Sequence, residues 1–467
     1  MIDLALPRVV FYLVTIFGVL LVFLVPPFQA PDEDTHLFRA VTILEGNLLP
    51  KENQGVWGHY LPASLVEYAA SHRYLIGNLD QKYSYARWYI DSHQKMEREP
   101  RVFRTFSTQS SSPFLYIPQV SGILIGKILY SVSPLRNLGF NWPAALYFSR
   151  LGNLFVFAFV LAFVLKILPR YHAIVSFLAL TPMSIHLASS SGYDVTTIVT
   201  CAFFFALTAV IVNSRRTPNA KEKIYYAIVA FLLTQAKIVY MPLLLLLLVF
   251  WRRMESKEHI KFSIYIVASS VTGILLTLFV FGLPKDPDLA KASHEQLVYL
   301  VTNLGAIPEL IYGTLIHFSD YYTISFLGNL GWLDTNFSLP VIVGLWGILL
   351  CAFIHDALGG PSPFGLTGNV IMILGSLFSV ILIMLVLYVI WTSVQQNGIG
   401  ASLVDGVQGR YFIPIFPFFI AAFAATPIFI KDRLSILQPR LLEFQVLGNV
   451  VVLILTVCVV ILRYWVK

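Results

Sequence analysis

Long apolar runs, separated by short polar or charged segments, make up most of this chain. Runs such as 151–168, 264–283 and 446–462 approach or exceed the length that crosses a hydrocarbon core of about 30 Å. They predict an all-α polytopic membrane protein with about eleven transmembrane helices, in a range of about ten to thirteen. The predicted spans are 9–25, 147–166, 173–187, 195–212, 224–233, 238–251, 262–283, 341–357, 370–391, 412–430 and 446–462.

The spans divide the chain into five parts. These are a first transmembrane helix (1–27), a large first extracytoplasmic loop with juxtamembrane helices (28–142), a group of transmembrane helices (143–283), a second large extracytoplasmic loop (284–336) and C-terminal transmembrane helices (337–467). Residues 113–135 are interrupted by Gln119, Lys127 and prolines, which favours an amphipathic helix lying along the interface. The opening segment could also be a cleaved signal peptide, but Asp3 offsets Arg8 and weakens that alternative.

Composition agrees with this pattern. Hydrophobic residues make up 57% of the chain and charged residues only 12%, about half the charged share of a soluble protein. The net charge of +7 does not indicate a nucleic-acid partner, because the basic residues collect in short loops between spans. Cys201, Cys351 and Cys458 all lie inside apolar runs, so we expect inert thiols and no disulfide framework.

The basic residues also predict the orientation. When the spans are threaded alternately, most cations fall on one side, which the positive-inside rule assigns to the cytoplasm. These cations are Lys166, Arg170, Arg215, Arg216, Lys221, Lys223, Arg252, Arg253, Lys257, Lys261, Lys431, Arg433 and Arg440. The opposite side receives the two large loops and most of the polar residues that suggest chemistry.

An acidic cluster follows the first span, in the sequence Pro-Asp-Glu-Asp-Thr-His at positions 31–36. Charge beside a membrane span is costly and usually serves chemistry or ion binding. If Asp34 is the N-cap of a short helix, Asp32 and Glu33 face the lumen as candidate catalytic groups, with His36 beside them. Asp32 and Asp34 are also candidate ligands for Mg²⁺ or Mn²⁺. The alternative is a solvated cap that ends the first span.

Two further candidates open or interrupt spans on the extracytoplasmic side. Asp194 follows the serine-rich turn 189–193 and is either an N-cap or a ligand-binding residue. Lys237, followed by Tyr240, lies between two short apolar segments, where a broken helix is tolerated if it lines a water-filled cavity. The alternative for Lys237 is a lysine that snorkels to the interface.

The second half of the chain adds two motifs. Trp332 and Asp334 end the sequence Gly-Asn-Leu-Gly-Trp-Leu-Asp, where the tryptophan suits the interface or a sugar-stacking platform and the acid either binds substrate or is solvated. Gln408, Arg410 and Tyr411 open a predicted span against the positive-inside trend. A guanidinium offers bidentate geometry to phosphate oxygens, although Arg410 could instead pair with a nearby acid such as Asp405.

These motifs together resemble the C-type (GT-C) superfamily of membrane glycosyltransferases. The resemblance rests on Pro-Asp-Glu followed by His36, on Pro-Phe-Leu-Tyr-Ile-Pro at 113–118, which contains Tyr116, and on Phe-Ser-Arg-Leu at 148–151. With residues 190–194, 237–242, 331–334 and 408–414, the chain looks like one bacterial family of this superfamily, long filed as a domain of unknown function. The resemblance covers nearly the whole chain.

The resemblance implies a polyprenyl-phosphate-linked sugar as donor and an acid of the first loop as catalytic base. Asp32 matches the acidic motif best, with Glu33 beside it, and Lys237 and Arg410 match cationic positions that hold the lipid phosphate. The acceptor would be a cell-envelope glycan or a lipid-linked acceptor, reached from the extracytoplasmic side of a bacterial inner membrane. The family more often has proline where this chain has Asp34, and members differ in metal dependence, so a divalent cation stays open.

Two other classes of function fit a polytopic protein. A transporter or flippase of lipid-linked glycans predicts polar residues near the midplane in both halves, often with repeat symmetry. A scaffold or sensor predicts a large loop that binds an envelope partner and tolerates loss of Asp32. We favour the transferase because the informative polar residues lie on one side of the membrane and no repeat is evident.

Overall fold

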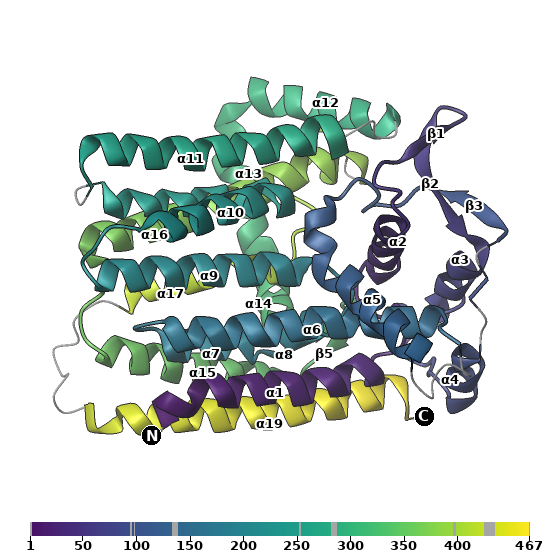
Figure 1. Ribbon diagram of the computed structural model, residues 1–467, viewed down its shortest axis with the longest axis horizontal. Helices are drawn as coiled ribbons and strands as arrows, with labels where there is room; N and C mark the ends of the chain where they lie inside the picture. Colours follow the sequence, from purple (N-terminus) through teal and green to yellow (C-terminus); the bar gives the residue numbers. More distant parts are fainter. Residues whose placement is uncertain are drawn as a thin grey trace.

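The computed structural model describes residues 2–93, 96–97, 99–132, 139–251, 254–281, 287–395, 398–424 and 435–466. Long helices run roughly parallel to one another and form a bundle, and a smaller mixed unit covers one end of it (Figure 1). We call the described part of residues 33–112 the cap and this end of the bundle the cap end. Among the orientation cations, Arg252, Arg253, Lys431 and Arg433 lie outside the described residues.

Eight described helical segments are long and apolar enough to cross a membrane by length and composition, as expected of a polytopic protein. They are α1 (Ile2–Leu24), η2 with α5 (Pro113–Tyr116 and Ile117–Val132), α6 (Trp142–Ile167), α9 (Asp194–Asn213), α11 with the π-helical η5 (Ser256–Leu275 and Leu276–Phe281), α15 (Leu339–Leu358), α16 (Gly365–Ile390) with η7 (Thr392–Val394), and α19 (Gln438–Tyr464).

Shorter elements occupy the positions of four other predicted spans. They are α7 (His172–Ala179) with α8 (Pro182–Ala188), α10 (Ala220–Ala236), the 3₁₀ helix η4 (Ile238–Phe250), and α17 (Phe416–Phe423), which follows η8 (Gly409–Phe412). The span expected at 412–430 is therefore described only to residue 424. Thr181 breaks the span expected at 173–187, because its hydroxyl accepts the Ser184 amide and starts α8 as a new helix.

The 3₁₀ geometry of η4 explains how such a short segment can extend through the bundle. Its 13 residues contain Pro242. At about 2.0 Å of rise per residue they span roughly 26 Å, against roughly 20 Å for an α-helix of the same length. Runs of 3₁₀ helix this long are uncommon.

The cap contains both helices and a sheet. Its elements are α2 (Glu33–Leu44), β1 (Lys51–Asn53), β2 (Val56–Pro62), α3 (Ala63–Ala70), η1 (Arg73–Leu75), α4 (Tyr85–Ser92) and β3 (Arg101–Arg104). The three strands form an antiparallel sheet in the order β1-β2-β3, with Tyr60 opposite Phe103. The sequence indicated an ordered subdomain with helices of its own but not the sheet.

The second large loop is also mostly helical. It contains α12 (Pro287–Thr302), η6 (Leu304–Ala306), α13 (Ile307–His317) and α14 (Ser319–Leu327), followed by the short hairpin β4 (Asn329–Leu330) and β5 (Thr335–Asn336). A final 3₁₀ turn, η9 (Ser435–Leu437), precedes α19.

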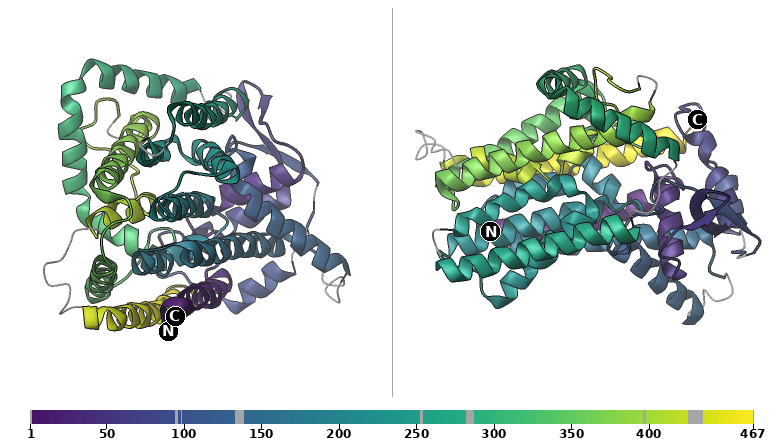
Figure 2. Two further views of the ribbon diagram at one scale, coloured as in Figure 1. Left: turned by 60° about the vertical axis from the view of Figure 1, so that its left-hand side comes forward. Right: turned by 90° about the horizontal axis from the view of Figure 1, so that it is seen from above.

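The first and last helices, α1 and α19, lie side by side along one edge of the bundle, and α19 ends beside the cap (Figures 1 and 2). The Trp465 indole nitrogen donates to the Leu24 carbonyl, and the Tyr83 amide of the cap donates to the Tyr464 carbonyl. The C-terminal helix therefore helps to fix the cap on the end of α1.

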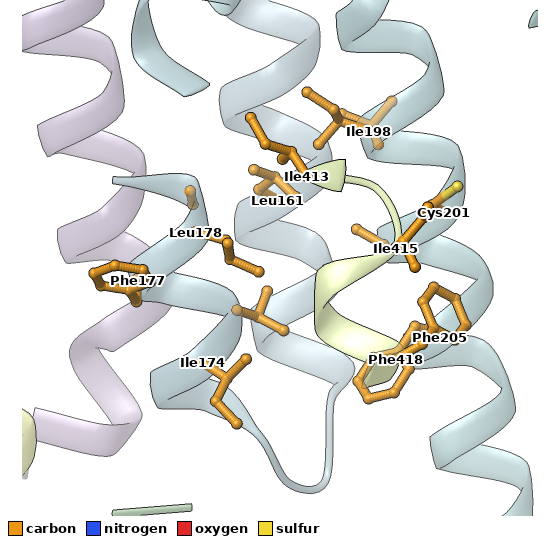
Figure 3. Close-up of a cluster of buried hydrophobic side chains, with 14 of the residues drawn as sticks. Leu161, Ile174, Phe177, Leu178, Ile198, Cys201, Phe205, Ile413, Ile415 and Phe418 are labelled. Carbon is orange, nitrogen blue, oxygen red and sulfur yellow. The ribbon is translucent and has the colours of Figure 1, made fainter. Parts of the chain in front are cut away.

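The apolar core joins elements that are far apart in the sequence. Figure 3 shows side chains of α6, α7 and α9 packed around the turn that leads into α17. Buried members are Leu161, Ile174, Phe177, Leu178, Ile198, Cys201, Phe205, Ile413, Ile415 and Phe418. Cys201 is buried, and Cys351 and Cys458 are also free thiols.

The helix expected along the interface packs on the beginning of α6. Arg150 bonds to carbonyls at the end of α1, and it is the eighth residue after Trp142, where α6 begins. The first residues of α6 therefore extend past the end of α1 by roughly 12 Å. On this overhang a Cβ at Gly122 of α5 would meet the Phe148 carbonyl oxygen at 2.0 Å. The outward face of α5, including Leu124, Ile125 and Ile128, is apolar and exposed. An interfacial position for α5 stays a prediction.

We predict that Gly122→Leu lowers stability by about 1–3 kcal/mol, because the added side chain has to push α5 away from α6. The measurement is the Tm in detergent. Gly347→Leu on α15 is the matched control, since a Cβ there meets nothing within 4 Å. Equal Tm values for the two variants would contradict the close helix contact.

Candidate functional site

One cavity at the cap end collects most of the polar residues that the sequence singled out. It has a volume of about 370 Å³ and lies between α2, the start of α9, the α10–η4 junction, α16 and η8. Its polar lining includes Asp32, His36, Asp194, Lys237, Tyr240, Arg410 and Tyr411. The structure thus brings together side chains that are up to almost 380 positions apart in the sequence.

Two cations flank one carboxylate at the centre of the cavity. The Asp194 carboxylate lies 3.4 Å from Lys237 Nζ and 3.5 Å from Arg410 Nη1. Arg410 Nη2 is also 4.0 Å from Asp32 Oδ2. The Lys237 ammonium lies 4.1 Å from the centre of the Tyr411 ring, a favourable cation–π position. Positive charge is therefore concentrated between two acids.

Breaks in regular structure place both cations. α10 ends at Ala236, and Lys237 has an extended backbone (φ −156°, ψ 113°) before η4 begins. The expected helix break at Lys237 is confirmed. Arg410 lies in the short turn η8 and is 8% exposed. The longer helix that the sequence predicted to start there begins only at Phe416, with Pro417 in its first turn.

The acidic cluster folds differently from the prediction. Asp32, not Asp34, is the N-cap of α2, and its left-handed backbone (φ 60°, ψ 12°) makes no side-chain cap bond. The helix thus starts earlier than expected and turns Glu33 and Asp34 inward. Asp32 is the acid of this cluster that reaches the cavity, and its side chain is half exposed.

Glu33 is a structural residue, and its predicted position facing the lumen is wrong. It is fully buried, and its two oxygens lie 2.8 and 2.6 Å from Arg150 Nε and Nη2. Glu33 also accepts the backbone amides of Phe28 and Ser191 at 3.0 Å. All its acceptor capacity is used, so it cannot take a proton from a substrate.

The same arginine holds the turn that carries Asp32. Arg150 donates to the carbonyls of Val22, Val25 and Pro26 at 2.7–3.0 Å, which fixes the end of α1. Within this turn Phe28 (φ 62°) and Asp32 (φ 60°) both adopt left-handed backbone, which costs a non-glycine residue about 1–2 kcal/mol.

Serine and amide side chains extend this buried network to Asp194. Asn153 donates to the carbonyls of Ser190 and Gly192, and Gln119 donates to the Gly192 carbonyl at 3.0 Å. The serine-rich turn is thereby fixed directly before α9, whose first residue is Asp194. The network sets the relative position of the two acids.

A metal site at Asp32 and Asp34 does not fit the geometry. Asp34 lies 3.2 Å from Arg73 and accepts the Thr35 amide, so its carboxylate is directed away from the cavity. Within the described ranges, no group of three or more His, Cys, Asp and Glu side chains is arranged to hold a metal ion.

Three other predicted residues lie near the cavity without lining it. Tyr116 is fully buried behind His36, and its hydroxyl lies 2.8 Å from His36 Nδ1. Gln408 precedes the turn that carries Arg410. Trp332 donates to the Phe28 carbonyl at 2.7 Å and so supports the Asp32 turn, and its stacking on sugar stays a prediction.

The Asp334 carboxylate bonds to α19 and to the cap. It lies 2.8 Å from Arg463 Nη2 and accepts the Gly77 amide at 3.2 Å. It does not line the cavity, and its contact with substrate stays a prediction.

The cavity also contains residues that the sequence reasoning missed. Ser107, Thr108 and Ser111 of the cap line it, as do apolar residues of α16, among them Ile383 and Leu387. The run of hydroxyl residues at 107–112 is the signal that could have identified the first group. The apolar group resembles any other membrane helix in sequence.

Burial controls the ionisation of Asp32 and His36, two titratable residues that line the cavity. It raises the pKa of Asp32, an effect that Arg410 opposes and that the charges of Asp34 and Asp194 reinforce. Burial also lowers the pKa of His36 to about 4, so the ring is neutral at pH 7. Asp32 is thus a stronger base than an ordinary aspartate.

Comparison with known proteins agrees with the membrane architecture. Residues 15–419 match the family model described as predicted membrane protein (DUF2142). The chain belongs to this family. No curated protein and no solved structure matches the chain. The matched residues include the cap, the cavity and most of the bundle. The family description assigns no activity to them.

We predict that Arg150→Met destabilises the protein by about 3–5 kcal/mol, because it leaves the Glu33 carboxylate buried without its partner. The measurement is chemical or thermal unfolding in detergent. Arg73→Met is the matched control, since Arg73 is 70% exposed in its pair with Asp34 and should contribute at most about 1 kcal/mol. Similar losses for both variants would contradict the central role of the Glu33–Arg150 pair.

Proposed function

We propose that this protein is an integral-membrane glycosyltransferase. It would move a sugar from a polyprenyl-phosphate-linked donor to a cell-envelope glycan or glycolipid. The membrane would be the bacterial inner membrane, with the cavity on its extracytoplasmic side. The observation that carries the proposal is the convergence of Asp32, Lys237 and Arg410 in one cavity that apolar residues of α16 also line.

The two cations of the cavity can hold a phosphodiester. Lys237 and Arg410 carry two positive charges, which the carboxylates of Asp194 and of ionised Asp32 balance. The contacts to Asp194, at 3.4 and 3.5 Å, are longer than a strong charge-assisted hydrogen bond. Both cations therefore have capacity left for a bound anion.

An apolar groove suits the tail of such a donor. It has a volume of about 640 Å³ and lies between η4, α11 and α16. Ile238 lines both this groove and the cavity, so the two adjoin next to Lys237. The groove continues along η4 as far as Leu248, and His259 of α11 lines the same groove. Each methylene buried there would contribute about 0.8 kcal/mol to binding.

The reaction would invert the anomeric centre by direct displacement. The acceptor hydroxyl oxygen attacks the anomeric carbon while its proton passes to the Asp32 carboxylate. The bond from the anomeric carbon to the phosphate oxygen breaks, and its electron pair stays on the lipid phosphate. Lys237 and Arg410 stabilise that charge in a partly dry cavity, where such interactions are strongest. Ser107, Thr108 and Ser111 line the cavity. The hydroxyls of Ser107 and Thr108 donate to Thr35, so their oxygens would accept from sugar hydroxyls.

We predict that Asp32→Asn lowers kcat by about 10²- to 10⁴-fold, the usual contribution of a general base. The fold should survive, because burial penalises the charged carboxylate and the neutral amide removes that penalty. Transfer of labelled sugar to an envelope acceptor and the Tm are measured together. Asp34→Asn is the matched control, since Asp34 does not line the cavity. Full turnover in Asp32→Asn would exclude Asp32 as the base.

The pH profile follows from the raised pKa of Asp32. A base acts only when deprotonated, so kcat/KM should fall as pH drops through a pKa above the ordinary aspartate value of about 3.9. His36, with a pKa of about 4, stays neutral over most of that range. An acid limb at or below the ordinary aspartate pKa would contradict this assignment.

We predict that Arg410→Ala weakens binding of polyprenyl phosphate by about 10- to 100-fold, the range for loss of a hydrogen bond to a charged group. Affinity is measured with the purified protein in detergent. The exposed Arg73→Ala is the control, because its pair with Asp34 lies away from the cavity. Unchanged lipid affinity in Arg410→Ala would make Arg410 a structural residue.

A further inference from the structure

The segment that leads into Arg410 has no regular structure but is closely held. Residues 398–409, which we call the strap, precede Arg410, and Gly409 is the first residue of η8. The glycines at 398, 400 and 406 have φ values between +64° and +82°, where a side chain would strain the backbone. A free loop of this composition would be mobile, so its position has to come from its contacts.

Three buried side chains, one from each helix of the second large loop, accept amides of the strap. Gln296 of α12 accepts the Gly400 amide at 3.0 Å, and Thr314 of α13 accepts the Val404 amide at 3.0 Å. Ser325 of α14 accepts the Gly409 amide at 2.8 Å, next to Arg410 in the chain. All three acceptors are 0% exposed.

The end of α16 and η7 hold the other side of the strap. The Tyr388 hydroxyl donates to the Ala401 carbonyl, and Thr392 accepts the Asp405 amide at 2.9 Å. A Cβ at Gly409 would lie 2.1 Å from the Tyr322 carbonyl oxygen of α14. The strap thus lies in direct backbone contact with α14 immediately before the arginine.

The arginine itself has few strong side-chain contacts that would fix it. Its nearest carboxylates are 3.5 and 4.0 Å away, and its Nε atom has no hydrogen-bond partner within the described part of the chain. The location of the guanidinium therefore depends on its backbone, and the backbone depends on the strap.

We propose that α12, α13 and α14 act as a clamp that positions Arg410 for anion binding through Gln296, Thr314 and Ser325. These three are positioning residues, since none of them lines the cavity. The second large loop would then be part of the binding machinery and more than a connection between spans. The effect on lipid phosphate rests on the proposed function, whereas the effect on the position of Arg410 does not.

Two variants test the clamp. Thr314→Val and Ser325→Ala each remove one acceptor and leave a buried amide unpaired. Thr314→Ser and Ser325→Thr keep the hydroxyl and should restore wild-type behaviour. Thr302→Val is the matched control, because the exposed Thr302 hydroxyl bonds to its own helix α12 and to the adjacent Asn303.

The first measurement does not depend on any substrate. Phenylglyoxal labelling of Arg410, followed by peptide mass spectrometry, should be at least about fivefold faster in Thr314→Val and Ser325→Ala, as expected for about 1 kcal/mol of lost restraint. Amide hydrogen exchange in the strap should rise in the same variants. Wild-type labelling and exchange rates in both variants would overturn the clamp, whatever the activity of the protein.

The second measurement uses polyprenyl phosphate as the probe. We expect about fivefold weaker affinity in the two variants, because the clamp positions the guanidinium that holds the phosphate. Faster labelling with unchanged lipid affinity would reject a role in anion binding. If the wild-type protein itself binds no polyprenyl phosphate, the proposed function fails, and the labelling result alone decides whether the clamp positions Arg410.

Discussion

The structure depends most on the buried ion pair between Glu33 and Arg150. Two charges in a dry interior are tolerated only when every oxygen and nitrogen finds a partner, and here the pair also binds two amides and three carbonyls. It joins the end of α1, the start of α2, the middle of α6 and the serine-rich turn before α9. The left-handed backbone at Asp32 persists because this network fixes both sides of the turn.

The two acids of the cavity have opposite surroundings, and that difference assigns their proposed roles. Asp194 lies between Lys237 and Arg410 and serves best as their permanent counter-ion. Asp32 is half exposed, is only loosely paired with Arg410 and has a raised pKa. Pairs of titratable groups whose environments push their ionisation apart are characteristic of acid–base sites. A carboxylate held by two cations is a poor base, which leaves Asp32 for that task.

Sequence reasoning succeeded for features that the membrane imposes on the chain. It failed for side chains whose positions depend on a partner far away in the sequence. Apolar runs predicted the polytopic class. Charged residues at positions where the membrane disfavours them indicated Asp32, Lys237 and Arg410 as candidate site residues. The sequence could not show that Glu33 turns inward while Asp32 turns outward, because Arg150 is 117 positions away from Glu33. For the same reason the sequence did not show that Asp334 and Trp332 bond to Arg463 and the Phe28 carbonyl. The cap sheet was missed because β2 pairs with β3 across a long separation in sequence.

The 3₁₀ helix η4 connects the apolar and polar halves of the proposed site. A groove of about 640 Å³ lies along it, between η4, α11 and α16. The extended rise of η4 lets 13 residues reach from the cavity toward the opposite end of the bundle. Lys237 is the residue directly before this helix. A lipid tail lying along η4 would therefore bring its phosphate to Lys237 without any rearrangement of the helices.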